Sequence, residues 1–202
     1  MTADRRVPSA DVAVVGTGFI GGTLGRALAR SGQRVVFGSR HPAEDDVAGD
    51  TSATVTSVDD ALAAADVVIL SVPAAAVSDL SEQFGGALVG KLVIDATNRM
   101  GGTDSNSRSV LPESVRYARA FNTLGGENMA DPVFGGVRAD MFFSAPEEDR
   151  GTVERIVEGV GLRPVYVGAD KEDLVDALFF LWVALAVGQA RGRRIAFRLL
   201  EG

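Results

Sequence analysis

Residues 11–30 read DVAVVGTGFIGGTLGRALAR, and this stretch decides the fold. Its first five residues are almost wholly apolar and predict a buried strand. A helical period then runs from Phe19 to Arg30, where Ser31-Gly32 ends the helix. The turn between strand and helix matches G-x-G-x-x-G, in which each glycine has its own role: a tight turn, room for a pyrophosphate, and close contact of helix and strand. We therefore expect a dinucleotide pyrophosphate to bind at Gly16, Thr17, Gly18, Phe19, Ile20 and Gly21. The competing interpretation, glycines that only make a turn, is weakened by this context.

The same alternation of strands and helices continues along the chain. Apolar segments predict further strands at 34–38, 66–70, 92–94, 116–120, 140–144 and 164–167, and helices beginning at Ser57 and spanning 77–84 and 147–160. Residues 1–9 are expected to be a loose tail, and 98–106 a loop. The fold class that we predict is α/β, a doubly wound, mostly parallel Rossmann-type sheet with a small C-terminal helical extension.

The end of the second predicted strand distinguishes between the nicotinamide cofactors. NAD-binding proteins usually place an acidic residue there for the ribose hydroxyls, whereas this chain has Gly38-Ser39-Arg40-His41 and no acid before Glu44. A serine hydroxyl and a guanidinium complement a 2′-phosphate, so Ser39 and Arg40 predict NADP. The plainer alternative is a solvated loop arginine. The neighbouring pair Asp45-Asp46 is interpreted as solvated or capping.

Composition excludes several function classes. The net charge of −7 argues against nucleic-acid and membrane-surface binding, and the longest apolar run, 177–187, is short for a membrane span. With no cysteine and only one histidine, the chain lacks the residues for disulfides, thiolate sites and the common catalytic triads, and no metal site is expected. No secretory signal precedes the first strand, so we expect a cytoplasmic protein.

Three segments are expected to line the crevice at the carboxyl ends of the strands, where ligands of such sheets bind. They are Ser71-Val72-Pro73, Asp95-Ala96-Thr97-Asn98 and Ala120-Phe121-Asn122-Thr123. They offer small side chains, amides and hydroxyls but, on this interpretation, no strong acid or base. Such a site suits direct hydride transfer, with Asn98 and Asn122 as positioning residues and no catalytic residue assigned. Ordinary loop chemistry remains the alternative for both asparagines. Lys91 and Lys171 are not placed like a dehydrogenase's catalytic lysine, and the short stretch after Gly168 is expected to leave little protein for recognising a metabolite.

The order of these motifs resembles a known family. The segments GTGFIGGTLGRALA, VVFGSR, VVILSVP, VIDATN, AFNTLGGENMADP, DMFFSA and LRPVYVG are similar, in order from about Asp11 to Leu200, to those of the NADPH-dependent reductases of the deazaflavin coenzyme F-420. The dinucleotide part also resembles the reductase domain of the STEAP metalloreductases. The resemblance implies that Thr17 to Gly21, Ser39 and Arg40 hold NADP, and that Val72, Pro73, Ala76, Ala96, Thr97 and Asn98 line the nicotinamide. The chain departs from the family pattern at two positions. Glu44 stands near a usually basic position at the phosphate site, and Arg99 replaces a proline at the acceptor site.

Three functions follow from these observations. The first is hydride transfer between NADP(H) and F-420; the second is reduction of a flavin (FMN or FAD) or a quinone; the third is a non-catalytic NADPH-binding module that senses redox state. We divide the chain into an NADP-binding domain, 10–168, and a C-terminal extension, 169–202, for dimerisation and the acceptor site.

The last predicted helix is apolar nearly all round, which requires burial. An apolar stripe of Leu174, Leu178, Leu181 and Leu185 is joined by Phe180 and Trp182 on other faces. We expect a two-fold interface between two copies of the chain, with Phe180 and Trp182 in it. Packing within one subunit is the alternative.

Overall fold

The computed structural model describes residues 11–100, 105–200 and 202. The tail expected at residues 1–9 lies outside these described residues, as does part of the loop expected at 98–106.

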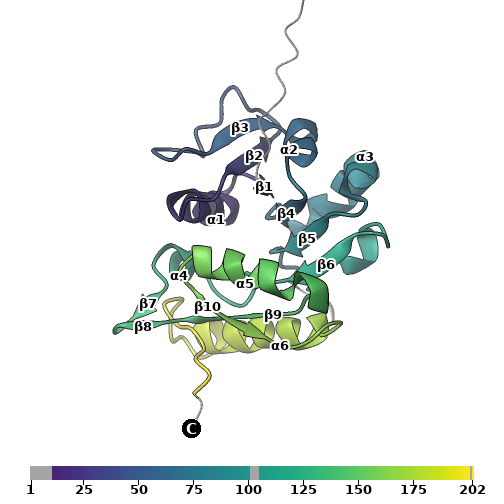
Figure 1. Cartoon of the computed structure of the whole chain (residues 1–202). Helices are drawn as coiled ribbons and strands as arrows, with labels where there is room; N and C mark the ends of the chain where they lie inside the picture. Colours follow the sequence, from purple (N-terminus) through teal and green to yellow (C-terminus); the bar gives the residue numbers. More distant parts are fainter. Residues whose placement is uncertain (1–10, 101–104, 201) are drawn as a thin grey trace, which may run out of the picture.

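Six parallel strands form the main sheet, in the order β3-β2-β1-β4-β5-β6 (Figure 1). Their bounds are β1 Val12–Val15, β2 Val35–Ser39, β3 Thr54–Ser57, β4 Val67–Leu70, β5 Leu92–Asp95 and β6 Arg116–Arg119. The strand order reverses between β1 and β4, and ligands of open parallel sheets bind at the carboxyl ends of the strands beside such a reversal. The predicted doubly wound α/β fold is confirmed.

Helices connect these strands and cover both faces. They are α1 Phe19–Arg30, α2 Val58–Ala64, α3 Val77–Leu88, α4 Gly126–Ala130, α5 Arg150–Gly159 and α6 Glu172–Val183, with the short turns η1 Ala74–Ala76, η2 Arg108–Val110 and η3 Glu147–Asp149 and the π-helical turn η4 Ala184–Gly188. The helix expected at Ser57 begins as predicted, because the Ser57 side chain accepts a hydrogen bond from the Asp60 N–H at 3.2 Å.

Alternate residues of each strand enter different cores, as the two-residue period of a strand requires. Val12 and Val14 of β1 pack in the core that includes Leu24 and Leu28 of α1 and the buried side of α5. Ala13 and Val15 face the opposite way, into the core formed with α2 and α3. All four β1 residues are buried, which explains the nearly continuous apolar sequence.

The two strands predicted near 140 and 164 form a sheet of their own. β9 (Asp140–Phe143) pairs in parallel with β10 (Arg163–Tyr166), and a single antiparallel bridge between Arg119 and Ser144 joins this pair to the end of β6. Among the described residues only that bridge connects the pair to the main sheet, an arrangement that the sequence did not predict. β7 (Val133–Phe134) and β8 (Val137–Arg138) form a small hairpin.

Helix α6 packs against β6 and β9 (Figure 1). Val175, Phe179 and Trp182 are buried within the chain, and the Trp182 indole N–H donates to the Ile195 carbonyl at 2.9 Å. The expectation that Trp182 lies in an interface between copies is therefore wrong. Leu174 and Leu181, in contrast, are 50% and 47% exposed and leave an apolar face open.

Arginine–carboxylate pairs hold the C-terminal segment, residues 189–200, against earlier parts of the chain. Arg193 pairs with Glu127 and Arg194 with Asp131, both of which lie in or beside α4. Arg198 contacts Asp140 of β9 at 3.1 Å. These contacts bring the segment back over α4 and β9.

Candidate dinucleotide and acceptor site

Backbone contacts fix the turn after β1. Gly16 has φ +104°, and a Cβ atom there would lie 2.8 Å from the Ser71 backbone. A Cβ at Gly21 would lie 1.9 Å from the Gly16 carbonyl oxygen, so only glycine allows this contact between helix and turn. A Cβ at Gly18 would meet no atom within 4 Å, which leaves its backbone open to a ligand. Gly16 and Gly21 thus have the turn and close-contact roles expected of them, and Gly18 leaves the space that a pyrophosphate would need.

The start of α1 can bind an anion. Gly18 is the N-cap residue and has no side chain to cap the first N–H groups, and the first turn carries no acidic residue. Unpaired N–H groups and the helix dipole attract a phosphate at such a position. The Ser71 hydroxyl donates to the Gly16 carbonyl at 2.9 Å and holds the turn against the end of β4. The residues present therefore fit a dinucleotide pyrophosphate.

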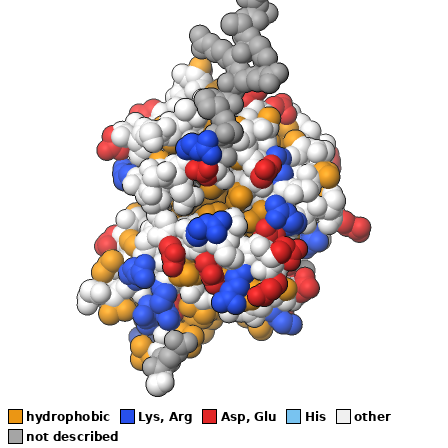
Figure 2. All heavy atoms as spheres, in the orientation of Figure 1, with side chains coloured by type: hydrophobic (Ala, Val, Ile, Leu, Met, Phe, Trp, Pro, Cys, Tyr) orange, Lys and Arg blue, Asp and Glu red, His pale blue; other side chains and the backbone are white. Residues whose placement is uncertain are grey.

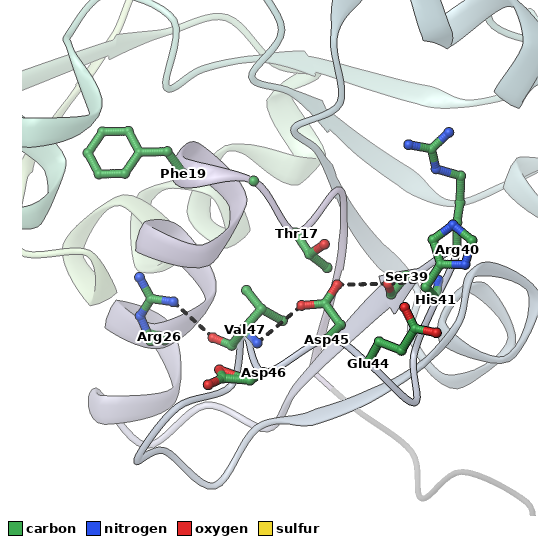
Figure 3. A pocket seen from close by; sticks show the side chains of 11 residues that line it. Thr17, Phe19, Arg26, Ser39, Arg40, His41, Glu44, Asp45, Asp46 and Val47 are labelled. Carbon is green, nitrogen blue, oxygen red and sulfur yellow. Dashed lines mark hydrogen bonds between the residues drawn. The ribbon is translucent and has the colours of Figure 1, made fainter.

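A polar cavity of about 590 Å³ lies beside this turn, at the end of β2 (Figure 3). Thr17 and Gly18 form one wall, and Ser39 and Arg40 form another; the rest of its lining is Phe19, Arg26, His41, Glu44, Asp45, Asp46 and Val47. The structure thus brings together the two motifs that the sequence connected, the glycine turn and the Ser39-Arg40 pair.

Asp45 lies inside this cavity, which the sequence interpretation missed. Its carboxylate accepts a hydrogen bond from the Ser39 hydroxyl at 2.8 Å and one from the Val47 N–H at 3.2 Å. Burial favours a raised pKa for Asp45, but hydrogen bonds from Thr17, Ser39 and Val47 outweigh it and lower the pKa, so the group is ionised. The expectation of a solvated or capping Asp45 is therefore incomplete: the loop 40–47 folds back and places the carboxylate on Ser39.

The two guanidinium groups of this cavity differ in their surroundings. Arg26 donates to the Val47 carbonyl at 2.9 Å and holds the loop. Arg40 is exposed and, within the described part of the chain, has no ion-pair partner; its side chain points away from Asp45 in Figure 3. Arg40 is thus accessible to a ligand, and its contact with a 2′-phosphate stays a prediction.

A second cavity, of about 350 Å³, lies on the other side of the start of α1. It is bounded by the α1 start, the loop before α4 and the inner side of α6, through Ile20, Asn98, Met100, Leu124, Gly125, Gly126, Phe179, Trp182, Val183, Val187 and Arg193. Arg193 is the one charged residue of this lining among the described residues, and it is paired with Glu127 at 2.6 Å. The described part of the lining therefore contains no free acid or base.

Not all the residues expected at the nicotinamide side line these cavities. Asn98 and Ile20 line the second one, whereas Val72, Pro73 and Ala76 line neither. Ala96 and Thr97 are buried, and the Thr97 hydroxyl is 2.9 Å from that of Ser107, so Thr97 also has a structural role.

Behind Asn98 and Asn122 lies a buried charged cluster that sequence reasoning did not find. Arg119, which is 0% exposed, contacts the Asp176 carboxylate at 2.8 Å and lies 3.5 Å from that of Asp95. Its guanidinium also donates to the Asn98 side-chain oxygen at 3.2 Å, and Asn122 donates to Asp176 at 3.3 Å. The expectation of a crevice without strong acid or base did not take account of this layer, in which Asp95 and Asp176 flank Arg119. The sequence signal for this cluster was a charged residue inside a strand, Arg119, and another inside an otherwise apolar helix, Asp176.

Three other features lie beside this cluster. Tyr117 donates its hydroxyl to Asp95 at 2.7 Å, and burial, followed by the charge of Asp95, raises the pKa of Tyr117 well above 10.0, so it remains protonated. Phe121, next to Asn122, is buried with φ +61°, a conformation that costs energy for a bulky residue. The Asn122 side-chain oxygen is buried and has no hydrogen-bond partner among the described residues. An acceptor without a partner is thus held beside the crevice.

Comparison with known proteins identifies the dinucleotide region. Residues 11–99 match the family model described as NADP oxidoreductase, coenzyme F420-dependent. Over this range the chain is similar to that family. The resemblance found in the motifs is confirmed over this range, which holds the turn, the polar cavity and Asn98.

Solved structures extend the likeness in fold beyond the NADP oxidoreductase region. A provisionally named F420-dependent NADP-reductase from Arthrobacter sp. FB24 has a TM-score of 0.78 at 21% identity, over 96% of this chain and 100% of that one. A reductive aminase from Aspergillus terreus, in complex with NADPH4, cyclohexanone and allyl amine, has a TM-score of 0.68 at 18% identity. The match covers 90% of this chain and 63% of that one. The 3-hydroxyisobutyrate dehydrogenase of Mycobacterium tuberculosis has a TM-score of 0.68 at 19% identity, and the match covers 90% of this chain and 62% of that one. At these identities the likeness concerns the fold alone.

Among the described residues, no group of three or more histidine, cysteine or acidic side chains could hold a metal ion. No helix in the same part of the chain is both long and apolar enough to cross a membrane.

Proposed function

We propose that this chain transfers hydride between NADP(H) and the deazaflavin coenzyme F-420 in the cytoplasm. The observation that carries the proposal is the pair of cavities on either side of the start of α1, one polar and one mostly apolar. A dinucleotide that lies across the glycine turn would reach from one cavity to the other. When bound, NADP(H) supplies or receives the hydride.

The polar cavity takes the adenosine end. We propose that Gly16, Gly18 and Gly21, with Phe19 and Ile20, hold the pyrophosphate at the helix start, and that Thr17, Ser39 and Arg40 contact the 2′-phosphate. Supporting this assignment are the open backbone at Gly18 and the exposed, unpaired guanidinium of Arg40.

The apolar cavity takes the acceptor ring. Its aromatic side chains, Phe179 and Trp182, suit a flat ring system, and the lining residues that the structure describes include no free acid or base. A reaction that moves a proton on a metabolite needs such a group, whereas hydride transfer between two cofactors needs alignment. We propose that Asn98 and Asn122 align the nicotinamide, with Ser71, Val72, Pro73, Ala76, Ala96 and Thr97 shaping that side of the crevice.

The experiment is to mix the protein with NADPH and follow the nicotinamide absorbance with F-420, FMN, a quinone or no acceptor. Oxidation that needs F-420 supports the proposal. Oxidation with FMN or a quinone and not with F-420 overturns it in favour of the second function. NADPH binding without oxidation under any acceptor overturns it in favour of a redox-sensing module.

A pair of variants tests the acceptor cavity. Val183→Trp fills part of the cavity and is expected to raise the KM for F-420 at least tenfold and to weaken NADPH binding by a smaller factor, since the adenosine and pyrophosphate contacts lie outside this cavity. Ala87→Trp adds the same side chain at an exposed position of α3 that lines neither cavity, and it should change neither constant.

We also propose that the chain forms a homodimer through the outer face of α6. Leu174 and Leu181 are half exposed, although leucine is usually buried, and Val187 on the following turn is 64% exposed. Leu174 and Leu181 are seven residues apart and lie on one face of α6, and a two-fold contact with a second copy would bury them on both chains.

A further inference from the structure

The site expected to recognise a 2′-phosphate already contains an anion. The Ser39 hydroxyl has one hydrogen to donate, and it donates it to the Asp45 carboxylate at 2.8 Å. The same hydroxyl oxygen accepts from the His41 N–H at 3.1 Å. Figure 3 shows the Asp45 carboxylate between Thr17 and Ser39, where both hydroxyls face it. A phosphate can therefore reach the Ser39 hydroxyl only by displacing Asp45 from it.

The charge balance of the cavity points the same way. Three carboxylates line it, from Glu44, Asp45 and Asp46, against the two guanidinium groups of Arg26 and Arg40. Arg26 is also committed to the Val47 carbonyl. A phosphate monoester carries up to two negative charges at neutral pH, so the acidic loop repels it more than a neutral ribose hydroxyl.

A ribose hydroxyl has the opposite relation to Asp45. It donates a hydrogen, and an ionised carboxylate is a strong acceptor for it. Carboxylates at the end of the second strand bind the ribose of NAD in this way. Here the acid reaches that place from six residues further along the chain, because the Val47 N–H and the Arg26–Val47 contact hold the loop folded back.

We propose that Asp45 is the residue that sets the choice between NADPH and NADH, and that it weakens the preference for NADPH so that the chain binds both cofactors. The inference rests on the proposed dinucleotide site. Ser39 and Arg40 favour the 2′-phosphate, whereas Asp45 opposes it and accepts a hydrogen bond from the ribose hydroxyl of NADH.

The test measures binding of four nucleotides by isothermal titration calorimetry, with the wild type and Asp45→Asn. The probes are NADPH and NADH, and adenosine 2′,5′-bisphosphate and ADP for the adenosine end alone. The amide of Asp45→Asn is close in shape to the carboxylate but has no charge. We expect the ratio of the NADH to the NADPH dissociation constant to rise about tenfold, which corresponds to ~1.4 kcal/mol. In Asp45→Asn the ratio of the ADP to the adenosine 2′,5′-bisphosphate dissociation constant should rise by the same factor.

Asp46→Asn is the matched control. It removes the same charge from the same loop, but Asp46 is exposed, whereas the Ser39 hydroxyl donates to Asp45. Because solvent and salt screen an exposed charge, Asp46→Asn should change the ratio by about twofold at most. If Asp45→Asn leaves the ratio unchanged, or Asp46→Asn changes it equally, the inference about Asp45 is overturned while the dinucleotide site stands. If none of the four nucleotides binds the wild type, the dinucleotide site itself is wrong and the inference falls with it.

Discussion

Replacement of Arg119 by methionine tests the buried charged cluster behind the crevice. Arg119 is 0% exposed, and its side chain contacts Asp176 at 2.8 Å and the backbone carbonyls of Asp95 and Thr97 at 3.1 and 2.6 Å. Arg119→Met keeps much of the volume but leaves two buried carboxylates without their cation. Removal of one partner of a buried ion pair typically costs about 3–5 kcal/mol, because the remaining charge stays buried.

For a chain of this length, 1 kcal/mol changes the melting temperature by about 2–4 °C, so Arg119→Met should lower it by about 6–20 °C. Differential scanning calorimetry measures the temperature, and urea titration measures the free energy of unfolding. The control is Arg30→Met, since the Arg30–Asp50 pair is 59% and 82% exposed and such pairs contribute about 0–1 kcal/mol. A loss for Arg119→Met of under about 1 kcal/mol, or one equal to that of Arg30→Met, would refute the reasoning.

Three further predictions concern separate parts of the chain. Gly21→Ala should weaken NADPH binding at least tenfold, since its Cβ would lie 1.9 Å from the Gly16 oxygen, whereas Gly86→Ala, with open space around its Cβ, should leave calorimetric binding unchanged; equal effects would contradict the assigned turn. Burial favours a raised pKa for Asp140, but its arginine partners outweigh burial and lower the pKa, so its stabilisation is present above the ordinary carboxyl value of 3.8 and is lost as the pH falls through the folded value. Asp140→Asn should therefore have a lower free energy of unfolding than the wild type at neutral pH, and the difference between the two proteins should shrink below pH 3.8. Urea titrations at several pH values measure it, and a difference that does not change with pH would contradict this prediction. Leu181→Glu should give monomers in light scattering, because it places a charge in the proposed apolar interface; an unchanged dimer would exclude this face.

The main sheet was predictable because its strands have simple sequence signatures. The apolar run of β1, the glycine turn and the helical period of α1 agree with one another, and the bounds of α1 match the prediction residue for residue. β3, Thr54–Ser57, was missed because it is short, rich in hydroxyl side chains and only partly buried at the sheet edge. Local pattern also could not show that β9 and β10 leave the main sheet, since strand pairing depends on contacts distant in sequence.

In the candidate site, too, local motifs were predictable and contacts that depend on the folding of the chain were not. The turn and the Ser39-Arg40 pair were predictable because each is a local motif. Asp45 was not, because its place depends on how the 40–47 loop folds back onto Ser39. The cluster of Asp95, Arg119 and Asp176 joins residues up to 81 positions apart in the chain, and neither composition nor period reports such a contact.

The position of Asp176 on α6 bears on how the chain unfolds. From that helix its carboxylate accepts hydrogen bonds from the Ser105 N–H, the Asn106 side chain and Arg119, all of which precede the expected domain boundary at Gly168. Loss of α6 would leave these buried groups without their acceptor, so neither part should melt independently. We therefore expect a single cooperative transition, and the boundary at Gly168 divides the chain by topology rather than into autonomous folding units.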